Sequence, residues 1–229
     1  MEYWDIMVLG DRCWVMGTWN EERSLSPFLP FSLSAPSAPP LHHSSTPFPE
    51  VPIVIRGERV ILRGVEPSDV RQLWEWRNDE EGMRLRDYPE PPYPLAQAEK
   101  EYEESQCDGH HLRLVIVTLD GELIGETALT HIDQRSGEAD FNIAIGNKAY
   151  WGKGYGTDAT RALMKYAFEQ MNLHRVTLYV HYFNARAIRV YEKCGFQVEG
   201  RMRKAHYMDG QYTDVLLMGL LREDFEALK

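Results

Sequence analysis

The sequence predicts a mixed α/β domain, in which helices flank a mostly antiparallel central sheet and a low-complexity N-terminal extension precedes it. Short segments with strand-like alternation follow one another at hairpin spacing over residues 112–145. Two strand–helix units then occupy residues 141–168 and 175–195. Residues 24–52 are rich in serine and proline, which is typical of a linker or tail. With 229 residues, 43% of them hydrophobic, the chain can build one sizeable core.

The extension is predicted to cover residues 1–52 and the domain residues 53–229. Trp4, Trp14 and Trp19 follow no clear period, so the start of the chain could dock as a short element. The alternative is that translation starts downstream and that this segment is upstream sequence read through. The sequence leaves both interpretations open.

The first part of the domain is expected to combine one strand with two helices. Residues 60–63 alternate as a strand. Ser68 is expected to cap a helix that continues to Arg77, and residues 96–105 are predicted to form a second, acidic helix.

A strand meander should follow these helices. Residues 112–118 and 122–129 are predicted to form a hairpin, because the Asp-Gly pair at 120–121 favours a tight turn. A loop at 133–137 then leads into a strand at 138–145.

Three glycines at alternate positions, Gly152, Gly154 and Gly156, separate this strand from the next helix. Bare backbone amides at the positive end of a helix favour an anion such as phosphate. Two nucleotide motifs fit poorly, since the dinucleotide motif needs its third glycine where Thr157 stands and the P-loop needs Ser or Thr after Lys153. Taken alone, the loop could also be a glycine-rich turn without a ligand.

The second unit is a strand at 175–180 followed by a helix with clear ends. Asn184 is a good N-cap, and Gly195 stands where a glycine commonly ends a helix. Residues at helical spacing should form the buried face of this helix: Ala187, Val190, Tyr191 and Cys194.

These two units in this order resemble the GNAT superfamily of N-acetyltransferases. The (Arg/Gln)-x-x-Gly-x-(Gly/Ala) loop of that family is matched by residues 151–156, with Trp151 in place of the usual Arg or Gln. The Asn-x-x-Ala element matches at Asn184 and Ala187, and the Tyr-Glu-Lys-x-Gly-Phe element at residues 191–196.

The resemblance runs over about residues 53–224, and the tail at 199–214 looks like the branch of ribosomal-protein N-terminal acetyltransferases and spermidine acetyltransferase. It implies an enzyme that uses acetyl-CoA as co-substrate and holds the pyrophosphate on the glycine loop. The residues assigned to donor binding are Ile143, Ile145, Trp151, Gly152, Lys153, Gly154, Tyr155, Gly156, Thr157, Asn184 and Ala187.

The resemblance also implies roles in catalysis. Tyr191 would protonate the departing thiolate, although its place on the apolar face equally suits core packing. A backbone amide of residues 143–145 would polarise the thioester carbonyl, because a bulge in that strand splays it from its parallel neighbour. Cys194 is interpreted as a packing residue, which favours direct transfer in a ternary complex over an acetyl-cysteine intermediate.

A carboxylate on the same strand is the candidate base. Asp140 lies on the strand face opposite Phe141, and Glu138 shares its parity as the second candidate. Either carboxylate could instead be no more than a solvated strand end.

No metal site is expected. The pair His42 and His43 lies in the extension, and His110 and His111 have only Cys107 as a nearby soft ligand.

The formal net charge of −10 favours cationic acceptors over nucleic acid. The resemblance implies that the acceptor binds between the helical region with Trp76, Arg77 and Tyr88 and the C-terminal hairpin, because those segments flank the cleft in the family. We expect a peptide α-amino group, since its pKa of about 7.7 to 8.0 leaves more free amine than lysine has. The alternatives are a small amine, namely a polyamine, amino sugar or aminoglycoside, and a non-catalytic acetyl-CoA-binding module.

A cytoplasmic protein is expected, because no apolar run approaches the roughly 18 residues of a membrane span and the start lacks the basic head of a signal peptide. Three distant cysteines suit a reducing compartment. A homodimer is left open.

Overall fold

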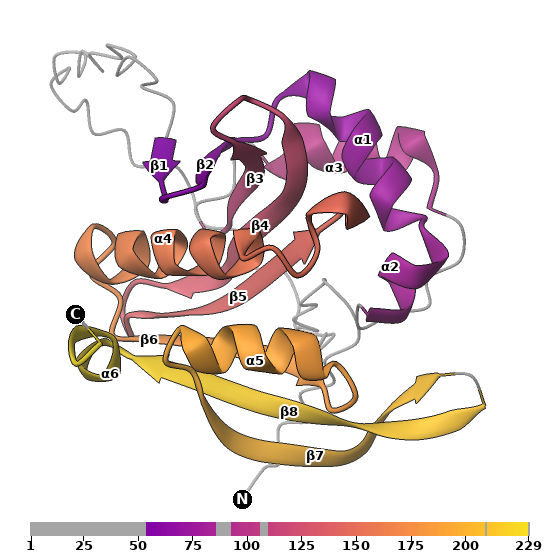
Figure 1. Ribbon diagram of the computed structural model, residues 1–229. Helices are drawn as coiled ribbons and strands as arrows, with labels where there is room; N and C mark the ends of the chain where they lie inside the picture. Colours follow the sequence, from indigo (N-terminus) through magenta and orange to yellow (C-terminus); the bar gives the residue numbers. More distant parts are fainter. Residues whose placement is uncertain (1–53, 86–92, 106–109, 209, 229) are drawn as a thin grey trace, which may run out of the picture. The chain divides into compact units, whose positions relative to one another are not determined.

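The computed structural model describes residues 54–85, 93–105, 110–208 and 210–228 (Figure 1). The chain divides into two units, and every described residue belongs to the second, which begins at Phe48. The expected extension at residues 1–52, including its tryptophans, therefore lies outside the described residues.

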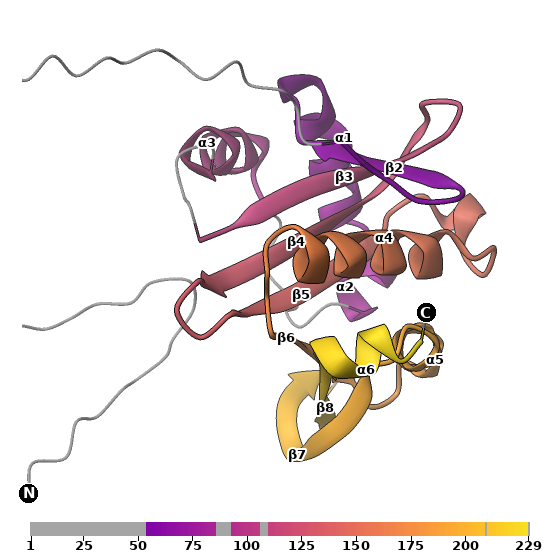
Figure 2. The same cartoon turned by 90° about the vertical axis from the view of Figure 1, so that its left-hand side faces the viewer.

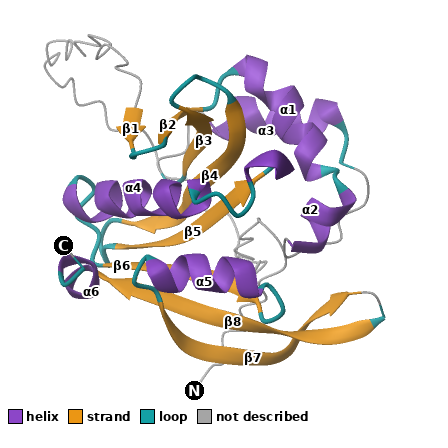
Figure 3. Ribbon diagram, viewed as in Figure 1, coloured by secondary structure: helices purple, strands orange, loops and turns teal. Residues whose placement is uncertain are grey.

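The domain is built on a mostly antiparallel sheet of eight strands in the order β1-β2-β3-β4-β5-β6-β8-β7 (Figure 3). Only β5 and β6 run parallel, so the predicted mixed α/β class is confirmed. The strands are β1 (Val54–Arg56), β2 (Val60–Gly64), β3 (Leu112–Thr118), β4 (Leu123–Asp133), β5 (Glu138–Ile145), β6 (Arg175–His181), β7 (Gln197–Met208) and β8 (Gln211–Leu221).

Helices cover both faces of the sheet. They are α1 (Pro67–Arg77), α2 (Glu80–Leu85), α3 (Leu95–Ser105), the 3-10 turn η1 (Lys148–Tyr150), α4 (Tyr155–Glu169), α5 (Ala185–Lys193) and α6 (Arg222–Glu226). α1 and α3 lie at the end of the domain that holds β2 and β3, and α5 and α6 lie at the end that holds β7 and β8 (Figures 1 and 2).

Two apolar clusters hold these layers together. The larger one packs α4, through Leu163, Met164 and Phe168, against the strands, and all three side chains are buried. The smaller one packs Leu73 of α1 on Val115 of β3, on the other face. Among the described residues, no helix is long and apolar enough to cross a membrane.

The predicted cap of α1 was wrong. Glu66, not Ser68, is the N-cap, and its backbone N–H donates a hydrogen bond to the carboxylate of Asp69 at 2.8 Å. Pro67 explains the difference, because proline suits the first helical position and disfavours helical backbone at the residue before it.

Several other elements went unpredicted or differ in length. β1 precedes the strand expected to be first, and the short helices α2 and α6 bury none of their residues. β4 continues to Asp133 instead of ending at Leu129, with an irregular register after Thr130. β3, β5 and α3 agree with their predicted bounds to within a residue.

Candidate active site

The glycine loop after β5 has a backbone that only glycine adopts readily. Gly152 and Gly154 have φ angles of 72° and 89°, in the left-handed region. A Cβ atom at Gly152 would meet nothing within 4 Å, and one at Gly154 would meet only Arg59 Nη1, at 3.9 Å. The glycines are therefore required by the backbone conformation, and open space lies beside them.

Helix α4 begins directly behind this loop. Its N-cap, Gly154, forms no side-chain hydrogen bond to the first turn, where Gly156 and Thr157 lie. The uncapped amides and the positive end of a helix of 15 residues favour an anion. This open, bare backbone suits a phosphate group.

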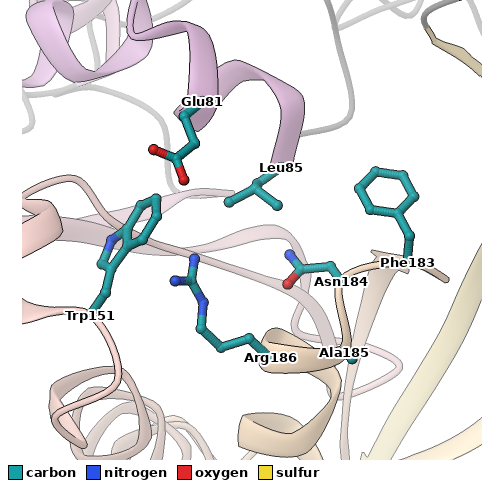
Figure 4. A pocket seen from close by; sticks show the side chains of 7 residues that line it. All are labelled: Glu81, Leu85, Trp151, Phe183, Asn184, Ala185 and Arg186. Atoms are coloured by element: carbon teal, nitrogen blue, oxygen red, sulfur yellow. The ribbon is translucent and has the colours of Figure 1, made fainter.

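Trp151, which opens the loop, is turned toward the end of β5. Its indole N–H donates a hydrogen bond to the carbonyl oxygen of Ile145 at 2.6 Å. The guanidinium carbon of Arg186 lies 3.9 Å from the centroid of the indole ring (Figure 4), an attractive cation–π geometry. The side chain of Trp151 thus joins β5, the loop and the first turn of α5.

Tyr150 anchors the start of the loop to the turn between β3 and β4. Its hydroxyl donates a hydrogen bond to Glu122 at 2.5 Å, and this bond raises the pKa of Tyr150 to about 12. The ring of Tyr155 packs edge-on against Tyr150 at 5.0 Å. The loop is therefore held at both ends.

The parallel strands β5 and β6 separate next to this loop. Their pairing ends at Asp140 and Thr177. Beyond that point β5 stays paired with β4 as far as Ile145, while β6 stays paired with β8. Ile143 and Ile145, the positions expected to offer a backbone donor, are half-buried in this separated part of β5.

An open pocket of about 310 Å³ lies beside the loop (Figure 4). α2, the loop and the start of α5 all contribute to it. Its lining residues are Glu81, Leu85, Trp151, Phe183, Asn184, Ala185 and Arg186. Asn184 also caps α5 as predicted, since its side-chain oxygen accepts a hydrogen bond from the Ala187 amide at 3.1 Å.

Tyr191 lies on the buried face of α5 and is 8% exposed. Its ring packs edge-on against Phe141 of β5, with centroids 6.2 Å apart, and against Phe196 at 6.0 Å. Tyr191 therefore joins α5 to the strand that separates from β6, and it contributes to the core at the same time.

The two candidate bases lie at the other end of β5 from the glycine loop. Asp140 belongs to the last residue pair before β5 and β6 separate, on the face opposite the buried Phe141. One of its carboxylate oxygens lies 3.0 Å from His131 Nδ1. Glu138 is exposed and lies opposite Arg175 in the sheet. Asp140 is thus nearer to the opening between the strands.

Cys194 is only 3% exposed, and burial raises the pKa of its thiol to about 11. A thiol with this pKa stays protonated near neutral pH, which makes it a poor nucleophile. Within the described ranges, no group of three or more His, Cys, Asp or Glu side chains could hold a metal ion. His42, His43 and Cys107 lie outside those ranges.

Several polar residues at the site were not predicted. Arg59, in the turn between β1 and β2, contacts the loop, and its backbone N–H donates a hydrogen bond to Asp158 in the first turn of α4. Arg186 stacks on Trp151, and His131 pairs with Asp140. Only His131 had a sequence signal, because hairpin register places it near Asp140. The others depend on contacts between distant segments.

A bare glycine loop before a helix, next to two separating parallel strands, is typical of the class of proteins that bind a phosphate-bearing ligand. The family model described as the acetyltransferase (GNAT) domain matches residues 59–197. The chain belongs to this family and is an acetyl-CoA-dependent N-acetyltransferase.

The chain is similar to several individual acetyltransferases. Spermidine N(1)-acetyltransferase of Escherichia coli K12 is 31% identical over 168 residues, which cover 73% of this chain and 89% of that protein. The uncharacterized SPbeta prophage-derived N-acetyltransferase YokL of Bacillus subtilis is 29% identical over 171 residues, 74% of this chain and 94% of that protein. The structure of spermidine N-acetyltransferase from Vibrio cholerae with CoA and spermine has a TM-score of 0.69 and 29% identity, and covers 73% of this chain and 98% of that one.

Proposed function

We propose that this chain transfers the acetyl group of acetyl-CoA to a primary amine of a small polyamine, with spermidine as the first candidate. The observation that supports this most strongly is the similarity to spermidine acetyltransferases, which covers nearly the whole length of those proteins. The comparisons favour this small-amine alternative over the expected peptide α-amino group.

In this proposal the backbone of residues 152–157 holds the pyrophosphate, and acetyl-CoA supplies an activated acetyl thioester. Asn184, the N-cap of α5, lines the pocket through which the rest of the donor would reach β5, and its side-chain oxygen accepts a hydrogen bond from the Ala187 amide. The separated edge of β5 at Ile143 and Ile145 offers backbone N–H groups to the thioester carbonyl. A preorganised donor of this kind can stabilise the transition state by about 2.7 to 4 kcal/mol.

The reaction forms a bond from the amine nitrogen to the acetyl carbon and breaks the bond from that carbon to sulfur. Asp140, with Glu138 as the second candidate, would take the proton of the ammonium group through water. Tyr191 would give a proton to the leaving thiolate. The His131 ring beside Asp140 can share that proton or hold the carboxylate in place.

The acceptor would bind on the side of α1 and α2. Trp76 of α1 packs closely on Gly146, which follows β5. A Cβ atom added at Gly146 would lie 2.1 Å from the indole ring of Trp76. Asp79 and Glu81 lie next to it and share Lys148 at 2.9 Å. Aromatic rings and carboxylates are the groups that attract an ammonium ion. Tyr88, expected in this region, lies outside the described residues.

A panel of acceptors tests the proposal. We expect the highest kcat/KM with spermidine or spermine, measured as release of CoA thiol, and lower values with N-terminal peptides, amino sugars and aminoglycosides. Turnover with peptides and none with polyamines would restore the peptide acceptor. Tight acetyl-CoA binding without turnover on any amine would instead support a non-catalytic module.

A further inference from the structure

The acetyl-CoA loop is held by a turn that lies about a hundred residues earlier in the chain. The carboxylate of Asp158, in the first turn of α4, accepts backbone hydrogen bonds from Glu58, Arg59 and Val60 at 3.0, 2.7 and 3.1 Å. The turn is shaped around this carboxylate, because a Cβ atom at Gly57 would lie 2.5 Å from an Asp158 oxygen. One side chain thus ties the β1–β2 turn to the start of α4.

Arg59 extends this contact to the loop itself. Its Nη1 donates a hydrogen bond to the carbonyl oxygen of Lys153 at 3.1 Å. In a trans peptide the C=O and the following N–H point in opposite directions, so this bond also directs the amide of Gly154 away from Arg59. Glycine tolerates many backbone conformations, and an unanchored Gly154 would sample several of them.

Because Asp158 is negatively charged, its hydrogen-bond partners in the β1–β2 turn affect how well the loop can bind a phosphate. A carboxylate in the first turn of α4 competes with phosphate for the positive end of the same helix. Its three backbone hydrogen bonds direct its charge toward the β1–β2 turn. The helix end is thereby left to the phosphate.

We propose that Asp158 and Arg59 are positioning residues for acetyl-CoA, which fix the glycine loop in the form that binds the pyrophosphate. The proposal rests on the assignment of that loop to the donor. Because neither residue reaches the reacting atoms in this account, their loss should weaken donor binding and leave the chemical step nearly unchanged.

Calorimetric titration of the full chain with acetyl-CoA, together with steady-state kinetics, tests this. Asp158→Asn and Arg59→Ala should each raise the Kd and the KM for acetyl-CoA about tenfold, the typical effect of losing a charge-assisted hydrogen bond. The kcat at saturating acetyl-CoA and the KM for the amine should stay near the wild-type values. Arg59→Lys keeps a donor for the Lys153 carbonyl and should restore most of the affinity.

Two matched controls separate positioning from general damage. Asp133→Asn removes another carboxylate that accepts backbone N–H groups in a turn, and Arg56→Ala removes an exposed arginine of β1. Both should leave the Kd for acetyl-CoA unchanged. An unchanged Kd in Asp158→Asn, or a fall in kcat equal to the rise in KM, would overturn the proposal. A wild-type chain that binds acetyl-CoA without turnover would defeat the acetylation function alone, because the Kd comparison would still hold.

Discussion

Tyr191 has a packing role in the core and a proposed role in catalysis. Its ring fills the core between Phe141 and Phe196, and its hydroxyl is the proposed acid for the leaving thiolate. Burial alone does not separate the two roles, because the residue would be buried in either case. A substitution that keeps the ring and removes the hydroxyl does separate them.

Tyr191→Phe should therefore lower kcat by roughly two to four orders of magnitude, the usual contribution of a general acid. Acetyl-CoA affinity and the unfolding temperature should barely change, because the ring contacts remain. Steady-state rates and calorimetry on the same preparation measure both quantities. Wild-type turnover would leave Tyr191 with its packing role alone.

Cys194 provides the complementary test, since direct transfer needs no thiolate nucleophile from the protein. Cys194→Ala should keep kcat near the wild-type value while reducing stability by on the order of 1 kcal/mol, because it leaves a small cavity beside α4. Rates and chemical denaturation measure the two effects. Loss of turnover in the folded variant, or an acetyl group found on Cys194 by mass spectrometry, would point to a covalent intermediate.

Among the elements, the loop between β5 and α4 depends most directly on the left-handed backbone conformation of one residue. Gly154 is both the N-cap of α4 and a residue with φ of 89°. A β-branched side chain strains this conformation and would project into the open space beside the loop.

Gly154→Val should consequently weaken acetyl-CoA binding at least about tenfold, because strain of this kind costs on the order of 1 to 3 kcal/mol. Gly210→Val is a matched control, since Gly210 has φ of 79° and equally open surroundings in the turn before β8. The control should lose stability but bind acetyl-CoA normally in calorimetry. Equal affinity in both variants would remove the loop from the donor site.

The elements also show what the sequence could predict. The bounds of β5 and the Asn184 cap of α5 followed from alternation and capping, which are local properties of the chain. α2 escaped prediction because it buries none of its residues and therefore has no apolar period.

The site was less predictable than the fold. The glycine loop could be predicted directly, but the hydrogen bonds of Asp158 with the β1–β2 turn join residues 98 to 100 positions apart. The orientation of the Trp151 side chain likewise depends on its contacts with Arg186 and with the carbonyl oxygen of Ile145. Pairwise contacts between distant segments leave no periodic signal in a single sequence.

For the whole domain, the site lies where two parts of the sheet meet. The first part runs from β1 to β5 and the second comprises β6, β8 and β7, and only three residue pairs, ending at Asp140 and Thr177, join them. The donor loop belongs to the first part, and Asn184 and Tyr191 follow β6 in the second. In the proposed mechanism, acetyl transfer therefore requires both parts of the sheet to be assembled.

This arrangement predicts that the domain acts without the N-terminal extension. The eight strands that the structure describes and the family match at residues 59–197 lie after Val51. A protein that begins at Val51 should fold and bind acetyl-CoA with the Kd of the full chain, as measured by thermal unfolding and calorimetry. Insolubility or a weaker Kd would show that the extension contributes to the domain or to a dimer contact.

The most direct test of the central claim is mass spectrometry of the products formed by the full chain from acetyl-CoA and spermidine. We expect monoacetylated spermidine to accumulate in step with free CoA thiol, and the protein itself to remain unacetylated. Release of thiol without an acetylated amine would show that the protein only hydrolyses acetyl-CoA. No product from spermidine or any other amine, in a protein that binds acetyl-CoA, would contradict the proposed function.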